Sequence, residues 1–158
     1  MSYDFNVDDI FEIAEQLERN GAAFYRDAAG SVDDSEIKTF LLEFAAMEDD
    51  HEKTFISLRK KLTAAEKTPT VFDPGNESAL YLKALADTRV FFKKEIDTSS
   101  VEEIFKSAIT AEKDSIVFYL GMKDLVAETL GKGKMDGIIK EEMGHIKILS
   151  QKLAALKR

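Results

Sequence analysis

The chain has 158 residues, of which 44% are hydrophobic and only two are proline, so it suits one folded domain with a continuous core. Its formal net charge of -8 disfavours nucleic acids and anionic membrane surfaces as partners. It has no cysteine, which excludes disulfides, iron–sulfur clusters, thiolate nucleophiles and zinc ribbons. No apolar run reaches the roughly 18 residues of a membrane span, and the first residues lack the apolar core of a signal peptide. We therefore expect a single domain over residues 1–158 in a cytoplasmic protein.

Apolar residues at spacings of three and four predict helices over most of the chain, and so an all-α protein. The first helix should extend from Val7 to about Ala29 and the second from about Asp33 to about Ala65. A third should extend from Val101 to Leu125, because Ser100 and Glu103 form a capping box at its start. A fourth apolar pattern continues to the C-terminus.

The segment between the second and third helices has a different composition. Both prolines, Pro69 and Pro74, fall within residues 67–99, next to a glycine and an asparagine. This indicates a crossover connection. Residues 77–87 contain enough apolar positions for a short extra helix that covers one edge of the bundle.

The sequence repeats itself without a gap at an offset of 94 residues. Identical residues recur at that offset far more often than average composition would give: Val7, Ile10, Phe11, Ala14, Glu18, Phe24 and Tyr25 match Val101, Ile104, Phe105, Ala108, Glu112, Phe118 and Tyr119. The same register pairs Glu48 with Glu142 and His51 with His145. The two halves therefore look like copies of one helical hairpin.

The repeat and the local sequence disagree about where the fourth helix begins. Three glycines, Gly131, Gly133 and Gly137, indicate a start near Lys134, because glycine disfavours helix. The repeat instead places the start near Ala127, by analogy with the second helix. We favour the repeat.

Each half supplies one glutamate on its first helix and a Glu-x-x-His motif on its second. Thirty residues separate the two glutamates in each half, so two antiparallel helices bring them to the same height. The i to i+3 spacing places Glu and His on one helix face. Four buried carboxylates need compensating positive charge, and carboxylates with imidazoles suit iron or manganese. The predicted ligands of two metal ions are Glu18, Glu48, His51, Glu112, Glu142 and His145.

One Glu-x-x-His motif on a charged helix usually marks no more than a solvated face. This chain, however, has only two histidines, and both occupy the motif at the same register. That coincidence favours the two-metal interpretation.

Tyr25 and Tyr119 each lie seven residues, or two turns, after a predicted ligand. They could hydrogen-bond to that ligand, Glu18 or Glu112 respectively, or serve as radical sinks, and ordinary burial explains them equally well. These two tyrosines are the candidate catalytic side chains.

Four further residues lie near the predicted ligands. The small residues Gly21 and Ser115 lie one turn from them, which could leave a pocket for a small oxidant or simply permit close helix packing. Glu52 and Glu141 flank the motifs and point away from the ligand face, so we expect both to be solvated.

At these motifs the sequence resembles the rubrerythrin branch of the ferritin-like superfamily over nearly its whole length. The resemblance rests on the E-x5-F-Y strings that begin at Glu18 and Glu112, and on E-D-D-H at Glu48 and E-M-G-H at Glu142. It implies a ferritin-like antiparallel four-helix bundle with a long crossover between helices two and three. It also implies a di-iron centre that reduces hydrogen peroxide or dioxygen, although manganese or zinc could occupy the same ligands.

The chain departs from rubrerythrins in two ways. It lacks the cysteines of their rubredoxin domain, so its reductant should be a separate donor such as a rubredoxin-like protein. It has Ser115 where they carry a further glutamate, which predicts a symmetric six-ligand site.

Two alternative functions stay open at this point. Iron oxidation and storage of the ferritin type fits less well, because only thirteen residues follow His145 in this sequence and the gap from Glu48 to Glu112 is long. For the same reason we expect a homodimer and not a storage shell. The other alternative is a metal-free helical interaction module.

Overall fold

The computed structural model describes residues 7–62, 80–82, 84–85, 98–124 and 131–156. Four long helices account for most of them: α1 (Val7–Gly30), α2 (Ser35–Lys60), α4 (Val101–Lys123) and α5 (Lys132–Leu156). The described part of the chain contains no strand, so the predicted all-α class is confirmed. None of the described helices combines the length and the hydropathy that crossing a bilayer requires.

Local sequence signals fix the start of two helices. The Asp34 side chain accepts hydrogen bonds from the backbone N–H groups of Glu36 and Ile37 at the start of α2. At the start of α4, Ser100 Oγ accepts from the Glu103 N–H at 3.1 Å, as its capping-box position predicted. At the start of α1, the candidate capping residue in the sequence is Asn6, which lies outside the described residues.

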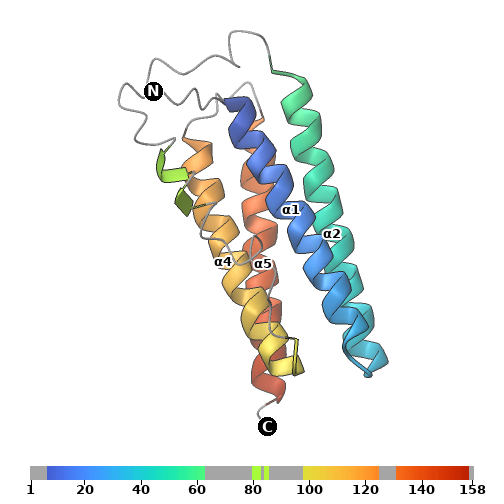
Figure 1. The fold of residues 1–158 in the computed structure, drawn as a ribbon. Coiled ribbons are helices and arrows are strands. Elements are labelled where there is room, and N and C mark those ends of the chain that lie inside the picture. Colours follow the sequence, from blue (N-terminus) through green and yellow to red (C-terminus); the bar gives the residue numbers. More distant parts are fainter. Residues whose placement is uncertain (1–6, 63–79, 83, 86–97, 125–130, 157–158) are drawn as a thin grey trace.

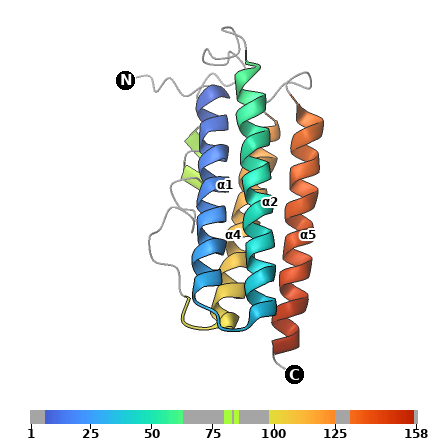
Figure 2. The same cartoon turned by 90° about the vertical axis from the view of Figure 1, so that its right-hand side faces the viewer.

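The helices form two antiparallel hairpins that pack side by side (Figures 1 and 2). α1 packs on α2, α4 packs on α5, and α1 also contacts α4. α2 ends and α4 begins at opposite ends of the bundle (Figure 1), so the intervening residues must connect the two ends. This is the ferritin-like arrangement that the sequence predicted.

Ion pairs connect the N-terminal end of α1 to the C-terminal end of α2. Arg59 binds Asp8 through two nitrogens, at 2.9 and 3.2 Å, and Glu15 at 3.1 Å. Because Glu15 is buried, the guanidinium compensates a carboxylate that would otherwise destabilise the helix pair.

The predicted start of the fourth helix near Ala127 was wrong. Gly131 adopts a φ of 98°, outside the helical region, and α5 begins only at Lys132. A side chain at position 131 would also overlap the Leu58 side chain, so both conformation and space require glycine there. The repeat preserves the spacing of apolar residues in the two halves, but it does not preserve the turn at Gly131. Ala127 itself lies outside the described residues.

The second helix also ends earlier than predicted, at Lys60 with Lys61 as its cap. Ala65, Leu125 and most of the crossover segment lie outside the described residues. Within that segment, residues 80–82 and 84–85 are helical, which agrees with the predicted short helix. Leu82 is buried against α4, where a methyl group on Gly121 would come within 2.9 Å of it.

The core is rich in aromatic side chains. Five phenylalanines of the long helices are buried in it: Phe24, Phe40, Phe44, Phe55 and Phe118. They leave an apolar interior in which the few buried polar groups stand out.

Candidate metal centre

Three pairs of polar side chains meet in the middle of this apolar interior, and they are the six predicted ligands. α1 supplies Glu18 and α4 supplies Glu112, while the Glu-x-x-His motifs come from α2 and α5. All are at most 3% exposed: Glu18, Glu48, His51, Glu112, Glu142 and His145. The matched spacing in the two halves thus brings residues from four helices to one level, as expected.

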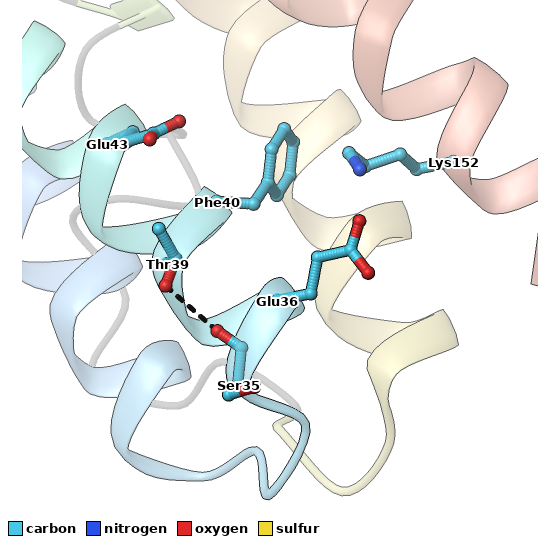
Figure 3. Close-up of a pocket in the computed structure, with 6 residues that line it drawn as sticks. All are labelled: Ser35, Glu36, Thr39, Phe40, Glu43 and Lys152. Carbon is cyan, nitrogen blue, oxygen red and sulfur yellow. Dashed lines mark hydrogen bonds between the residues drawn. The ribbon is translucent and has the colours of Figure 1, made fainter.

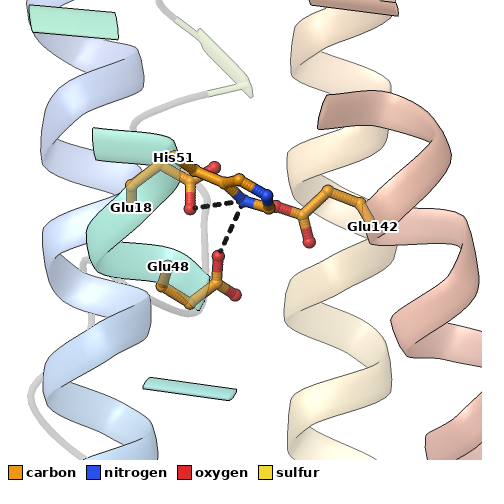
Figure 4. A group of neighbouring side chains, drawn as sticks. All are labelled: Glu18, Glu48, His51 and Glu142. Atoms are coloured by element: carbon orange, nitrogen blue, oxygen red, sulfur yellow. Dashed lines mark hydrogen bonds and ion pairs between the residues drawn. The ribbon is translucent and has the colours of Figure 1, made fainter. Parts of the chain in front are cut away.

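The six side chains form two overlapping groups of four. In each group, every residue offers one ligand atom within 4.8 Å of the others. Glu18, Glu48, His51 and Glu142 make one group (Figure 4), and Glu48, Glu112, Glu142 and His145 make the other. Two carboxylates, Glu48 and Glu142, belong to both groups. Each group could hold one cation, and Glu48 and Glu142 could then contribute to both positions.

Both histidines direct Nδ1 into the cluster. His51 Nδ1 lies 3.2 Å from Glu142, 3.3 Å from Glu48 and 3.5 Å from Glu18. His145 Nδ1 lies 3.3 Å from Glu112 and 3.4 Å from Glu142. Each imidazole therefore presents one nitrogen to one of the two groups.

The carboxylates have unmet bonding capacity that a cation would satisfy. Among the described residues, Glu48 Oε2, Glu112 Oε2 and Glu142 Oε2 are buried without a hydrogen-bond partner. Such orphaned oxygens are costly in a protein interior unless a charge or donor compensates them. Oxygen and imidazole nitrogen are also the donors that iron and manganese favour. The residues therefore fit a pair of divalent metal ions.

The pKa values of the metal-free cluster reflect this crowding. Burial, followed by the charge of Glu142, raises the pKa of Glu18 and raises that of Glu48 well above its usual range. Burial also opposes the charged form of His51, but hydrogen bonds to Glu142 and Glu18 outweigh it and raise the His51 pKa to about 11. For Glu142, hydrogen bonds from both histidines overcome burial and lower the pKa to about 2. Without metal, a proton on His51 is therefore shared in hydrogen bonds with Glu142 and Glu18.

The two tyrosines hydrogen-bond to predicted ligands across the halves. Tyr25 Oη donates to Glu112 Oε1 at 2.7 Å, and Tyr119 Oη donates to Glu18 Oε1 at 2.5 Å. The expectation that each contacts the glutamate of its own helix was wrong. Seven residues of helix rise about 10.5 Å, whereas the contact between α1 and α4 brings the other half's glutamate within reach.

Burial keeps the Tyr25 hydroxyl protonated. Tyr25 is fully buried, and burial together with the charge of Glu48 raises its pKa well above the usual value. Tyr25 therefore acts as a hydrogen-bond donor at neutral pH and not as a source of protons. Both aromatic rings also contact phenylalanines, Tyr25 on Phe44 and Tyr119 on Phe55.

The two small residues noted in the sequence, Gly21 and Ser115, are both buried, and Ser115 is 4% exposed. Phe44 lies against the ring of His145, with the ring centres 4.4 Å apart. At least one of the predicted imidazole ligands therefore has an aromatic neighbour.

Glu141 is exposed, as expected, and Glu52 is partly buried, but both carboxylates also have partners that the sequence did not predict. Glu52 pairs with Arg19 at 2.8 Å. Glu141 Oε2 lies 2.5 Å from His51 Nε2, on the ring edge opposite the cluster. Glu141 does point away from the ligands of its own helix, but it reaches across to α2. Spacing along one helix carries no signal for such a contact.

A sulfur atom occupies the corresponding place beside the other histidine. Met47 Sδ lies 3.1 Å from His145 Nε2. Met47 carries no motif of its own in the sequence. Its one distinguishing feature is that it occupies the same position of the repeat as Glu141. The outer edges of the two histidines thus face different chemical groups.

A surface pocket away from the cluster lies between the start of α2 and α5 (Figure 3). Ser35, Glu36, Thr39, Phe40, Glu43 and Lys152 line it. Its polar groups are engaged locally: Thr39 Oγ1 donates to the Ser35 carbonyl, and Lys152 Nζ lies 4.5 Å from the Phe40 ring centre. None of the six predicted ligands lines this pocket.

Comparisons with known proteins agree with this geometry. The family model described as Rubrerythrin matches residues 9–153. A crystal structure described as a ferritin-like diiron-carboxylate protein from Thermotoga maritima superposes with a TM-score of 0.71, at 25% sequence identity and with 98% of each chain covered. No curated protein sequence matches the chain. With the family model spanning nearly all of its length, and with the buried Glu/His cluster in place, the chain belongs to the rubrerythrin family.

Proposed function

We propose that this protein binds two iron ions and reduces hydrogen peroxide with electrons from a separate donor. The observation that supports it best is the pair of four-residue groups that share Glu48 and Glu142. Four ionised carboxylates carry four negative charges, which two divalent ions balance. The family and the Thermotoga maritima protein's description as a diiron-carboxylate protein favour iron over other metals.

The metal pair would supply the two electrons that, with two protons, convert one hydrogen peroxide molecule into two water molecules. The chain's own contribution is to hold the pair. Glu48 and Glu142 would serve both ions, while Glu18 with His51 and Glu112 with His145 would each complete the ligands of one ion. Because the six side chains are buried and come from four helices, the packing of the bundle would set their positions.

The tyrosines hold the terminal carboxylates. Each hydroxyl donates a hydrogen bond to one carboxylate oxygen, which leaves the other oxygen of Glu18 or Glu112 for a metal ion. Because Tyr25 stays protonated, this hydrogen bond persists at neutral pH.

Electrons for repeated turnover must come from outside the chain. It has no cysteine to bind an iron–sulfur or rubredoxin-type centre. A rubredoxin-like protein is the donor we propose. The homodimer expected from the sequence also stays a prediction, which light scattering would test.

Stopped-flow oxidation of the protein loaded anaerobically with Fe(II) tests the proposed reaction. We expect hydrogen peroxide to oxidise the bound iron quickly, and faster than dioxygen does. If peroxide leaves the iron reduced, or reacts far more slowly than dioxygen, the peroxidase proposal fails. Fast reaction with dioxygen and growth of a large iron core would indicate storage, and no metal binding would indicate a helical interaction module.

A further inference from the structure

The two histidines of the metal centre differ at the nitrogen that faces away from it. His51 Nε2 contacts a carboxylate oxygen of Glu141 at 2.5 Å. His145 Nε2 contacts the thioether sulfur of Met47 at 3.1 Å. The Nδ1 atoms, by contrast, face similar surroundings, with glutamate oxygens at 3.2–3.5 Å from His51 and 3.3–3.4 Å from His145.

This difference falls at two positions that the sequence repeat makes equivalent. Glu141 is 94 residues after Met47, so the two occupy the same position of the repeat, directly before the shared ligands Glu142 and Glu48. Each reaches across to the histidine of the other half. The tyrosine hydrogen bonds, in comparison, are matched between the halves. Among these contacts, the Met47 and Glu141 pair is where the symmetry fails.

The chemical consequence follows from the tautomer. A neutral imidazole that binds metal through Nδ1 carries its proton on Nε2, which must then act as a donor. A carboxylate accepts this proton in a strong, charge-assisted hydrogen bond, whereas a thioether is a weak acceptor. A carboxylate partner also fixes the ring and makes it a better ligand. His51 is therefore the stronger of the two imidazole ligands.

We propose that Glu141 is a positioning residue that makes the two metal positions unequal. The position formed with Glu18 and His51 binds a divalent cation more tightly than the position formed with Glu112 and His145, so the centre fills in a fixed order. This inference rests on the two-metal centre proposed above, and it assigns the order of filling to residue 141 and not to the six ligands.

The surroundings of Glu141 agree with a role at the entrance of this position. A surface pocket between α2 and α5 is lined by His51 and Glu141 together with Asp50, Thr54 and Lys134. The Glu141 side chain is 63% exposed, so it contacts solvent as well as the ligand. His51 therefore borders a surface pocket, on the side of the ring that faces Glu141.

Titration of the metal-free protein with Co(II), followed by visible absorption, tests the proposal. For the wild type we expect two binding steps whose affinities differ at least about tenfold. Glu141→Met gives both histidines the same thioether neighbour and should weaken the first step by about 10- to 100-fold, the range typical for loss of such a partner. Met47→Glu should strengthen the second step instead.

The double swap, Met47→Glu with Glu141→Met, is the sharpest variant. It keeps the composition of the pair and should reverse the order of filling. The Co(II)-shifted N–H resonance of each ligand histidine in the proton NMR spectrum identifies the occupied position, with single His→Ala variants as assignments. Glu43→Gln, which changes an exposed glutamate on α2, should leave both steps unchanged. Circular dichroism confirms that each variant folds.

Each outcome of this experiment is decisive. Two wild-type steps of equal affinity, or a Glu141→Met variant with an unchanged ratio, would overturn the inference while leaving the two-metal centre intact. A wild type that binds no Co(II) would instead overturn the metal centre and the proposed function with it.

Discussion

The hydroxyl groups of Tyr25 and Tyr119 tie the halves of the metal centre together, since each holds a glutamate that belongs to the other half. Both rings are almost fully buried. The bonds therefore contribute to the stability of the bundle as well as to the position of the ligands.

Tyr25→Phe should destabilise the metal-free protein by about 1–3 kcal/mol, the usual cost of leaving a buried hydrogen-bond acceptor without its donor. The substitution removes only the hydroxyl donor to Glu112, and the ring can stay in place. Tyr119→Phe is the matched variant and should cost a similar amount through Glu18. Urea denaturation measures both, and a loss below about 0.5 kcal/mol for each would show that these bonds do not stabilise the fold.

Metal binding should release protons at neutral pH. In the metal-free protein the His51 pKa is raised to about 11 and that of Glu48 is raised well above its usual range, so His51 is protonated at pH 7. A metal ion needs the free electron pair of Nδ1, so this proton must leave. The apparent metal affinity should therefore rise as the pH rises. Calorimetry in two buffers with different ionisation enthalpies measures the release, and a binding heat that does not depend on the buffer would contradict it.

That the six proposed ligands lie close together could be predicted from the sequence, because their placement is set by helix periodicity. The i to i+3 spacing and the equal thirty-residue separations place each Glu and His without any knowledge of tertiary structure. Contacts between helices could not be predicted in this way. The partners of Tyr25, Glu141 and Met47 depend on which helix lies opposite, and the sequence of one helix does not contain that information.

At the scale of the elements, the helix boundaries show which sequence signals are local. The capping box at Ser100 was predicted correctly, because its two residues lie within one turn of each other. The start of α5 was predicted incorrectly, because the repeat was given more weight than the glycines. An inherited hydrophobic pattern marks which face is buried, whereas a glycine with positive φ marks where the chain turns.

Gly131→Ala should destabilise the protein by about 1–3 kcal/mol, because alanine fits neither the φ of 98° nor the space beside Leu58. Gly137→Ala is the matched control within α5. A methyl group there meets nothing within 4 Å, so we expect it to be neutral or to stabilise by about 0.4–1 kcal/mol. Chemical denaturation compares the two. Equal stability of both variants would mean that the conformation of Gly131 does not contribute to the free energy of unfolding.

At the scale of the whole molecule, each of the two hairpins contributes three of the six proposed ligands to a common interior. α1 and α4 contact each other, and their glutamates and tyrosines are exchanged across that contact. Each group of four takes three residues from one hairpin and one from the other, so neither hairpin alone contains a complete group. The centre therefore depends on the assembled bundle, which the crossover between α2 and α4 makes possible within one chain.

Sustained peroxide reduction should require an added electron donor. The chain offers no cysteine for a second redox centre, so one oxidation of the bound iron should exhaust its electrons. Steady-state assays with and without a reduced rubredoxin-like protein test this, and we expect a single turnover without it. Continued turnover in the absence of any donor would contradict the proposal.

The most direct test of the whole account is the metal content of the protein after anaerobic loading with Fe(II) and removal of unbound iron. We predict about two iron ions per chain for the wild type and loss of bound iron in the double variant His51→Ala with His145→Ala. The variant removes both imidazoles but leaves the four carboxylates, so circular dichroism must show that it still folds. A double variant that retains the wild-type iron content, or a wild type that binds none, would contradict the account.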